Sequence, residues 1–109
     1  PDGFYLVGDE QNPTLEFHAS IIERVRQVTH IAPPDPQGQI CDISVAQEGL
    51  ILVPVKELGL CTSMTGATFV TTTEVYPDSP LVTHEICNQA QVAAIEAAID
   101  YVLARTGNP

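Results

Sequence analysis

Three polar residues at the start of the C-terminal helical segment have the types and spacing to bind a ligand. His84 and Asn88 stand four residues apart with Glu85 between them, so the three side chains share one helix face. The segment differs from the zinc-protease motif HExxH only at its last position, where Asn88 replaces the second histidine. A neutral amide is a poor zinc ligand, so the sequence excludes a zinc protease and predicts no metal here. Two interpretations stay open: the residues line a pocket, or they solvate the first helical turn, where Glu85 complements the dipole.

A second group of reactive side chains lies in the polar segment 61–68. Its hydroxyls, thiol and glycine suit a loop that binds a small anion through backbone N–H groups, although it lacks the lysine and glycine spacing of a P-loop. The candidate ligand-binding residues of this loop are Cys61, Thr62, Ser63 and Thr65. A nucleophilic thiol or hydroxyl here needs a nearby base, and the chain offers only His18, His30 and His84. An ordinary exposed turn has the same composition, so that interpretation also stays open.

The other polar side chains have structural interpretations. His18 lies beside the apolar positions of the first helical segment, which predicts a packed, hydrogen-bonded histidine. Thr71 and Thr73 fall on one face of a strand, a position that threonine favours. The spacing of a calcium-binding loop is absent, and no motif predicts a cofactor. The sequence therefore leaves open whether the protein is an enzyme.

The cysteine pattern excludes a disulfide framework. Cys41, Cys61 and Cys87 are odd in number and none forms a CxxC pair. We expect free thiols, as is usual in a cytoplasmic protein. Cys41 lies on the apolar face of its predicted strand with Ile43 and Val45, so it is expected to react slowest with a thiol reagent. Cys61, in a polar loop, is expected to react fastest.

The charge balance excludes several partners. Fourteen acidic residues against four basic ones give a net charge of −10, which leaves too few cations to neutralise nucleic-acid phosphates or to attract anionic lipid. No apolar run reaches the roughly 18 residues of a membrane span. We therefore expect an acidic, soluble, cytoplasmic protein that binds neither nucleic acid nor membranes.

Hydrophobic periodicity and turn residues predict the elements that position these groups. A strand at 3–7 is followed by a helix over about 13–29, with Asn12 or Thr14 as its cap. Alternation predicts a strand over 40–46, and the connection 47–49 predicts a hairpin with 50–55. A helical turn at 56–59 and a strand over 67–76 follow.

The last helix, over about 80–105, has the clearest stripe. Apolar side chains recur at helical spacing and predict the face that packs on the core: Val92, Ile95, Ile99, Val102 and Leu103. Several alanines fall outside this stripe, and small side chains permit close approach of another chain. They are either simple helix formers or a dimer contact, and the predicted assembly is a homodimer.

The whole chain, 1–109, is long enough to be one domain. The order β-α-β-β-β-α predicts an α+β fold, with a mixed or antiparallel sheet and two helices on one face. Two functions fit it. The first is a small binding or assembly module that lacks evident catalytic apparatus and recognises protein partners. The alternative is a small-molecule-binding protein or enzyme, whose pocket lies between the start of the last helix and the loop 61–66.

Overall fold

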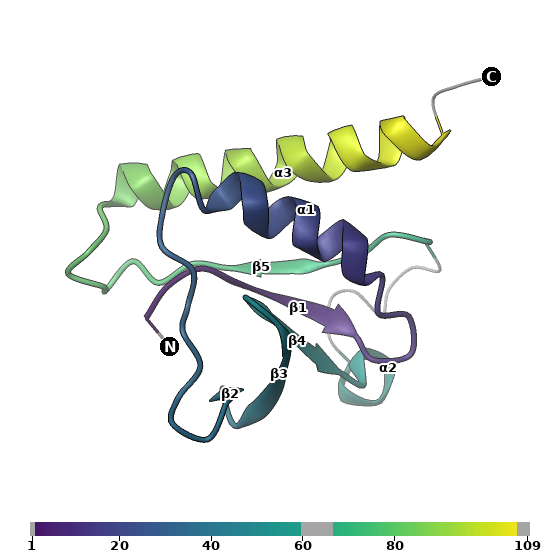
Figure 1. Cartoon of the computed structure of the whole chain (residues 1–109), viewed down its shortest axis with the longest axis horizontal. Helices are drawn as coiled ribbons and strands as arrows, with labels where there is room; N and C mark the ends of the chain where they lie inside the picture. The colour runs from purple at the N-terminus through teal and green to yellow at the C-terminus, as the bar shows by residue number, and fades with distance from the viewer. Residues whose placement is uncertain (1, 60–66, 107–109) are drawn as a thin grey trace.

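The computed structural model describes residues 2–59 and 67–106, which form one mixed β-sheet and a layer of helices (Figure 1). In chain order the elements are β1 (Tyr5–Asp9), α1 (Leu15–Val25), β2 (Gln39–Ile40), β3 (Ile43–Gln47), β4 (Leu50–Val53), α2 (Val55–Leu58), β5 (Thr72–Glu74) and α3 (His84–Thr106). The predicted α+β class and the two long helices are confirmed.

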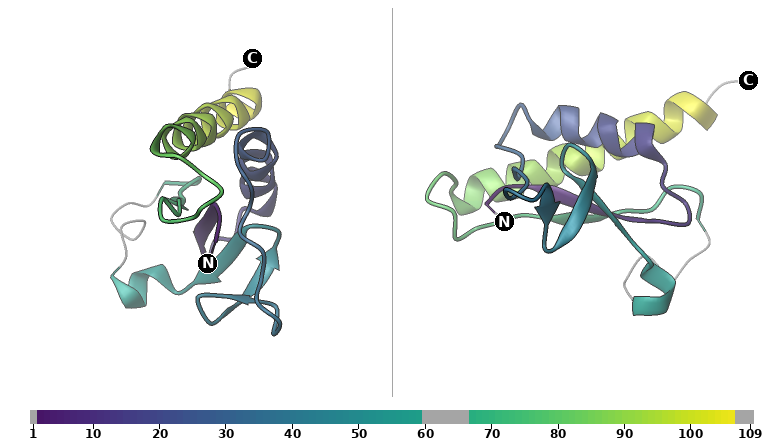
Figure 2. Two further views of the ribbon diagram at one scale, coloured as in Figure 1. Left: turned by 90° about the vertical axis from the view of Figure 1, so that its left-hand side faces the viewer. Right: turned by 60° about the horizontal axis from the view of Figure 1, so that its bottom comes forward.

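The five strands lie in the order β2-β3-β4-β1-β5. β1 pairs with β4 in parallel, while the β1–β5, β2–β3 and β3–β4 pairs are antiparallel. The sheet is therefore mixed, and the hairpin predicted at 47–49 joins β3 to β4. α1 and α3 lie side by side on one face of the sheet (Figure 2, left). Leu6 and Leu50 pair in register and are fully buried beneath them.

The strand predicted over 40–46 is in fact two strands joined by a tight turn. Cys41 and Asp42 have positive φ values of 52° and 64°, so the chain reverses there and β2 pairs back onto β3. A two-residue hairpin loop needs such left-handed backbone, because its twist then matches that of the strands. The alternation of apolar residues continues through the turn, which is why the sequence pattern concealed it.

α1 is capped by Thr14, one of the two predicted cap residues, and its span of Leu15–Val25 is shorter than the predicted 13–29. Asn12 instead turns back on β1, where its N–H donates to the Asp9 carbonyl, and its side-chain amide donates to the Thr68 carbonyl at 3.0 Å. Thr14 is the N-cap residue, although its side chain makes no capping bond. The strand predicted over 67–76 is likewise shorter, since only Thr72–Glu74 pairs with β1.

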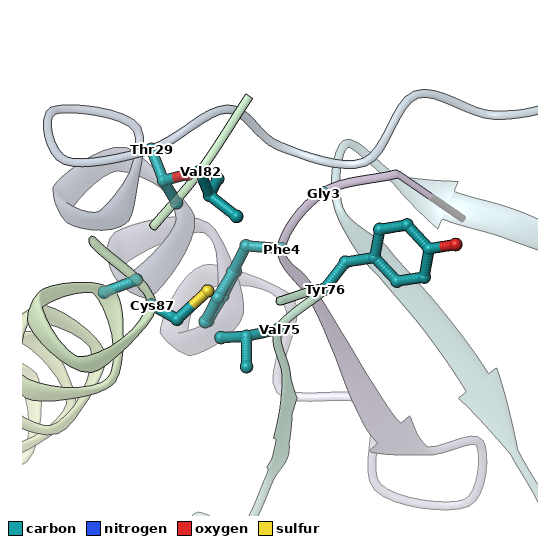
Figure 3. A pocket seen from close by; sticks show the side chains of 8 residues that line it. Gly3, Phe4, Thr29, Val75, Tyr76, Val82 and Cys87 are labelled. Carbon is teal, nitrogen blue, oxygen red and sulfur yellow. The ribbon is translucent and has the colours of Figure 1, made fainter. Parts of the chain in front are cut away.

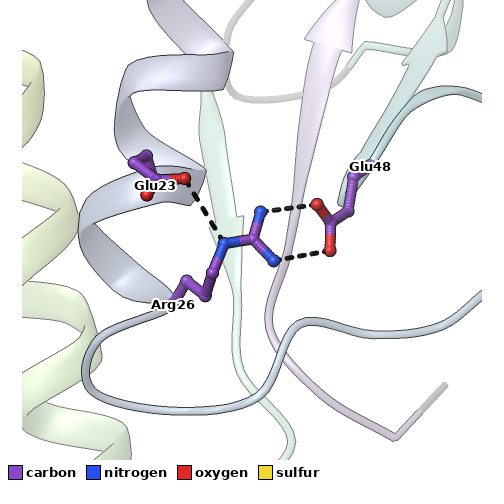
Figure 4. A network of polar contacts seen from close by, with 3 residues as sticks. All are labelled: Glu23, Arg26 and Glu48. Atoms are coloured by element: carbon purple, nitrogen blue, oxygen red, sulfur yellow. Dashed lines mark hydrogen bonds and ion pairs between the residues drawn. The ribbon is translucent and has the colours of Figure 1, made fainter.

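An exposed ion pair joins the end of α1 to the turn between β3 and β4 (Figure 4). The guanidinium of Arg26 donates two hydrogen bonds to the carboxylate of Glu48, one of 2.7 Å, and a weaker one of 3.4 Å to Glu23. The bond from Arg26 lowers the pKa of the Glu48 carboxyl, and the carboxylate raises the pKa of Arg26. Such a bidentate pair orients the helix end over the hairpin.

The core-facing side of α3 is the opposite of the predicted one. Its buried residues are small: Cys87, Ala90, Ala93, Ala94 and Ala97. The predicted stripe faces solvent instead, because four of its members are more than half exposed: Val92 (54%), Ile95 (57%), Ile99 (52%) and Leu103 (57%). Only Val102 packs partly against the core. The prediction that this stripe faces the core is therefore wrong.

The buried alanines allow α3 to lie close against its neighbours. The large side chains of the shared core come from the sheet and from α1, and include Phe4, Phe17 and Ile22. Opposite them, a row of methyl groups fills the remaining space without overpacking. These alanines cannot serve as a dimer contact, since the fold itself covers Ala90, Ala94 and Ala97.

Candidate functional site

The three polar residues predicted as a site lie in solvent at the start of α3. His84, Glu85 and Asn88 are all exposed. The helix is capped just before them, where the N–H of Ile86 donates to the Thr83 hydroxyl at 3.1 Å. Within residues 2–59 and 67–106, the Asn88 side chain makes no hydrogen bond.

Two of the three residues share a cleft. Glu85 and Asn88 lie in a cleft of about 410 Å³ between α3 and the end of α1, whose other lining residues are Val28, Gln89, Val92, Ala93 and Glu96. His84 does not line it. The predicted loop partners Cys61, Thr62, Ser63 and Thr65 fall outside the described residues. The cleft contains no buried polar side chain that would orient a ligand.

His18 is fully buried and is a structural residue, as its position predicts. Its Nδ1 lies 3.0 Å from the Thr14 carbonyl oxygen, and its Nε2 lies 3.0 Å from the Thr71 hydroxyl. A carbonyl can only accept, so the neutral ring donates from Nδ1 and accepts the Thr71 hydroxyl proton at Nε2. Burial lowers the pKa of His18. The ring thus links α1 to the chain that leads into β5.

Close packing around His18 involves β1 as well. A Cβ atom at Gly8 would lie 3.1 Å from the His18 ring and 3.0 Å from Leu52. With both nitrogens occupied and no exposed edge, His18 has no free nitrogen to act as a general base.

The thiols differ from expectation in their exposure. Cys41 lies at the exposed β2–β3 turn, where its sulfur is 3.4 Å from the Tyr5 hydroxyl. Burial raises the pKa of that phenol. Cys87 is the buried thiol. The expectation that Cys41 is the shielded cysteine is therefore wrong, because the turn at 41–42 takes it off the apolar strand face.

A small cavity lies beside Cys87, between the start of α3 and the sheet (Figure 3). Its volume is about 10 Å³, and Phe4, Val75, Val82 and Cys87 are among its lining side chains. That space is about the size of one water molecule. It is a packing gap rather than a substrate pocket.

The largest unexplained feature is the outer face of α3. Val92, Ile95, Ile99 and Leu103 follow one another along about 16 Å of helix. A second cleft of about 260 Å³ borders the same row and is lined by apolar side chains: Phe17, Phe69, Ala98, Ile99, Val102 and Leu103. We call the four exposed residues Val92, Ile95, Ile99 and Leu103 the outer stripe. A row of large exposed apolar side chains is typical of an interaction surface.

Sequence reasoning found the outer stripe but assigned it to the wrong side. A signal was present, because alanine recurs at positions 90, 93, 94 and 97 with the same helical spacing. Because this helix has two apolar sides, packing against the neighbouring elements determines which side is buried.

Within residues 2–59 and 67–106, no group of three potential metal ligands comes together. No helix in these ranges is long and apolar enough to cross a bilayer. No family model matches the chain, and no curated protein is significantly similar to it.

Proposed function

We propose that this protein is a non-catalytic assembly module that binds a protein partner through the outer stripe of α3. One observation carries the proposal: the largest aliphatic side chains of the longest helix point to solvent, while its alanines fill the core. Contacts of this kind bury apolar area, which drives protein association. A homodimer is the simplest such assembly, since two-fold pairs are the commonest oligomers.

A cytoplasmic location is part of the proposal. Cys41 and Cys87 are free thiols, which suits a reducing compartment. The charge also supports an assembly role over binding of polyanions. Arg24, Arg26 and Arg105 are each engaged by carboxylates.

Photo-crosslinking tests the proposal. A benzophenone amino acid at Ile95 is expected to give discrete covalent adducts in the cells that make the protein. The matched control is the same group at Leu58, which is equally exposed but lies on α2, far from α3 (Figure 1). Adducts that are no more abundant from position 95 than from position 58 would refute the interface.

The alternative function is small-molecule binding in the cleft that Glu85 and Asn88 share. The observation in its favour is that Glu85 and Asn88, both on α3, line one cleft together with Val28, which follows the end of α1. Native mass spectrometry of the purified protein tests it. A retained ligand that is lost on Asn88→Leu substitution would support this function, and a chain free of ligand would count against it.

A further inference from the structure

The carboxylate of Asp2, just before β1, joins three segments of the chain. The hydroxyl of Ser79, in the connection that leads to α3, donates a hydrogen bond to it. The Nε2 of His30, which follows α1, lies 3.0 Å from its Oδ1. Both bonds favour the ionised carboxyl, so Ser79 and then His30 lower the pKa of Asp2. We call Asp2, His30 and Ser79 together the clasp.

Ser79 is the buried member of the clasp, with 4% of its surface exposed. Its hydroxyl accepts a hydrogen bond of 3.1 Å from the N–H of Leu81 while it donates to Asp2. The backbone closes the same turn, since the N–H of Ser79 donates to the Tyr76 carbonyl at 3.1 Å. A buried hydroxyl that loses its partner costs free energy, so Asp2 stabilises the position of the whole turn.

The rest of the connection between β5 and α3 is lightly packed. Between residues 75 and 83, Ser79 is the one buried residue. Leu81 is 66% exposed and Tyr76 is 40% exposed. A segment with few buried apolar contacts opens at a lower free energy cost than the core. The bond from Ser79 to Asp2 is therefore one that a local opening of this connection has to break.

The N-terminal side of the clasp is held independently of Ser79. The N–H of Phe4 donates to the His30 carbonyl at 3.2 Å, and the N–H of Ala32 donates to the Phe4 carbonyl at 2.9 Å. The N-terminal segment therefore stays on the chain that follows α1 when Ser79 is released. The connection 75–83 is the part that moves.

The segments that the clasp joins also cover Cys87, in the first turn of α3. This thiol is 7% exposed. The cavity of about 10 Å³ beside it is lined mainly by residues close to the clasp in the chain (Figure 3): Gly3, Phe4, Thr29, Val75, Tyr76 and Val82. Opening of the connection removes part of this cover, so the reactivity of Cys87 reports the opening.

We infer that the clasp controls local unfolding at the start of α3, because Asp2 holds the connection 75–83 closed. Release of Ser79 exposes Cys87 while the sheet, α1 and the later turns of α3 stay folded. This conformational device goes beyond the proposed function, since it belongs to the single chain and needs no partner.

Timed labelling of the purified protein with a maleimide at neutral pH, followed by peptide mass spectrometry, tests the clasp. Asp2→Ala and Ser79→Ala are each expected to raise the labelling rate of Cys87 about three- to tenfold. Both substitutions break the same bond, so the double variant is expected to label no more than about twofold faster than Ser79→Ala.

The matched control is Asp78→Ala. Asp78 is an exposed carboxylate of the same connection and makes no hydrogen bond among the described residues. Its substitution is therefore expected to leave the labelling rate of Cys87 unchanged.

The dependence of labelling on urea separates local opening from global unfolding. A local opening exposes little surface, so the Cys87 rate below the unfolding transition is expected to depend only weakly on urea. Circular dichroism shows whether each variant is folded, and the folded one of Asp2→Ala and Ser79→Ala decides if the other unfolds. Labelling that Asp2→Ala leaves unchanged, that Asp78→Ala accelerates equally, or that follows the urea dependence of global unfolding overturns the inference.

Discussion

At the residue scale, His18 shows how burial determines chemistry. An imidazole can act as a general base, but the fold gives both ring nitrogens of His18 fixed hydrogen-bond partners, the Thr14 carbonyl and the Thr71 hydroxyl. Burial disfavours the charged imidazolium, which lowers the pKa from its ordinary value of 6.5. A group that is neutral in the folded state and protonates more readily in the unfolded state makes stability depend on pH.

We predict that the free energy of unfolding falls as the pH is lowered below about 6.5, because the unfolded chain then binds a proton that folded His18 does not. The contribution is complete above pH 6.5 and is lost progressively down toward the lowered folded pKa. Urea denaturation between pH 5 and 8 measures this slope. His18→Gln is expected to reduce the slope while lowering stability throughout, and an unchanged slope would contradict the assignment.

The cysteines make a second residue-scale prediction. A thiol reagent under native conditions is expected to modify Cys41 rapidly, since it is exposed at the β2–β3 turn, and Cys87 only when the protein unfolds. Peptide mass spectrometry after timed labelling distinguishes the two sites. Equal rates at Cys41 and Cys87 would show that α3 does not shield its inner face.

At the element scale, the helical spacing of residues in α3 does not determine which of its two apolar sides faces the core. The length of α3 and its cap at Thr83 are local properties, because both follow from neighbouring residues. Which side turns inward depends on the space left by Phe4, Phe17 and Ile22 on the neighbouring elements. That space accepts methyl groups and excludes isobutyl groups.

Adjacent positions on α3 are therefore expected to respond oppositely to substitution. Ala94→Leu overpacks the core and is expected to destabilise the protein by about 1 to 3 kcal/mol. Ile95→Ala, one residue further on, is expected to change the unfolding free energy of the monomer by less than about 0.5 kcal/mol. Chemical denaturation at low protein concentration measures both. If Ile95→Ala destabilised the protein more than Ala94→Leu, the outer stripe would face the core, as the sequence pattern predicted.

A substitution at Asn88 tests whether the first turn of α3 makes a structural contact. The Asn88 side chain is exposed, so Asn88→Leu is expected to shift the unfolding free energy by no more than about 0.5 kcal/mol. The leucine would extend the outer stripe and is expected to favour self-association. Thermal melts at low concentration, together with sedimentation, separate these effects. A large loss of stability would mean that Asn88 holds a structural contact that the fold does not display.

At the scale of the whole molecule, charge and its pairing set the range of partners. The chain carries a net charge of −10. Three of its four cations are already bonded: Arg24 to Asp100, Arg26 to Glu48 and Arg105 to Glu16. The field around the protein is therefore repulsive to polyanions.

We predict that the protein does not bind duplex or single-stranded nucleic acid at physiological salt, since the electrostatic contribution is unfavourable. Gel-shift titration with the protein at micromolar concentrations measures this. Lys56→Glu, which removes the one cation without an ion pair among the described residues, provides the control for any residual retardation. Micromolar binding that weakens in this variant would contradict the prediction.

The fold class could be predicted from sequence because its signals are local. Apolar periodicity and turn residues located both long helices, the β3–β4 hairpin and the helical turn ended by Gly59. The turn at Cys41 and Asp42 could not be predicted, because the alternation of side chains continues through it and cysteine is no turn signal. For the candidate site, sequence placed Glu85 and Asn88 on one helix face, and their shared cleft depends on where α1 ends.

The amino-acid sequence by itself determined where the helices and most strands form and how acidic the surface is, because these follow from neighbouring residues and composition. Only the tertiary structure decided which side of α3 is buried. Both sides are apolar, so the hydrophobic effect alone favours either. Packing density separates them, since the space beside α1 and the sheet fits Ala90, Ala94 and Ala97 and leaves the outer stripe exposed to solvent.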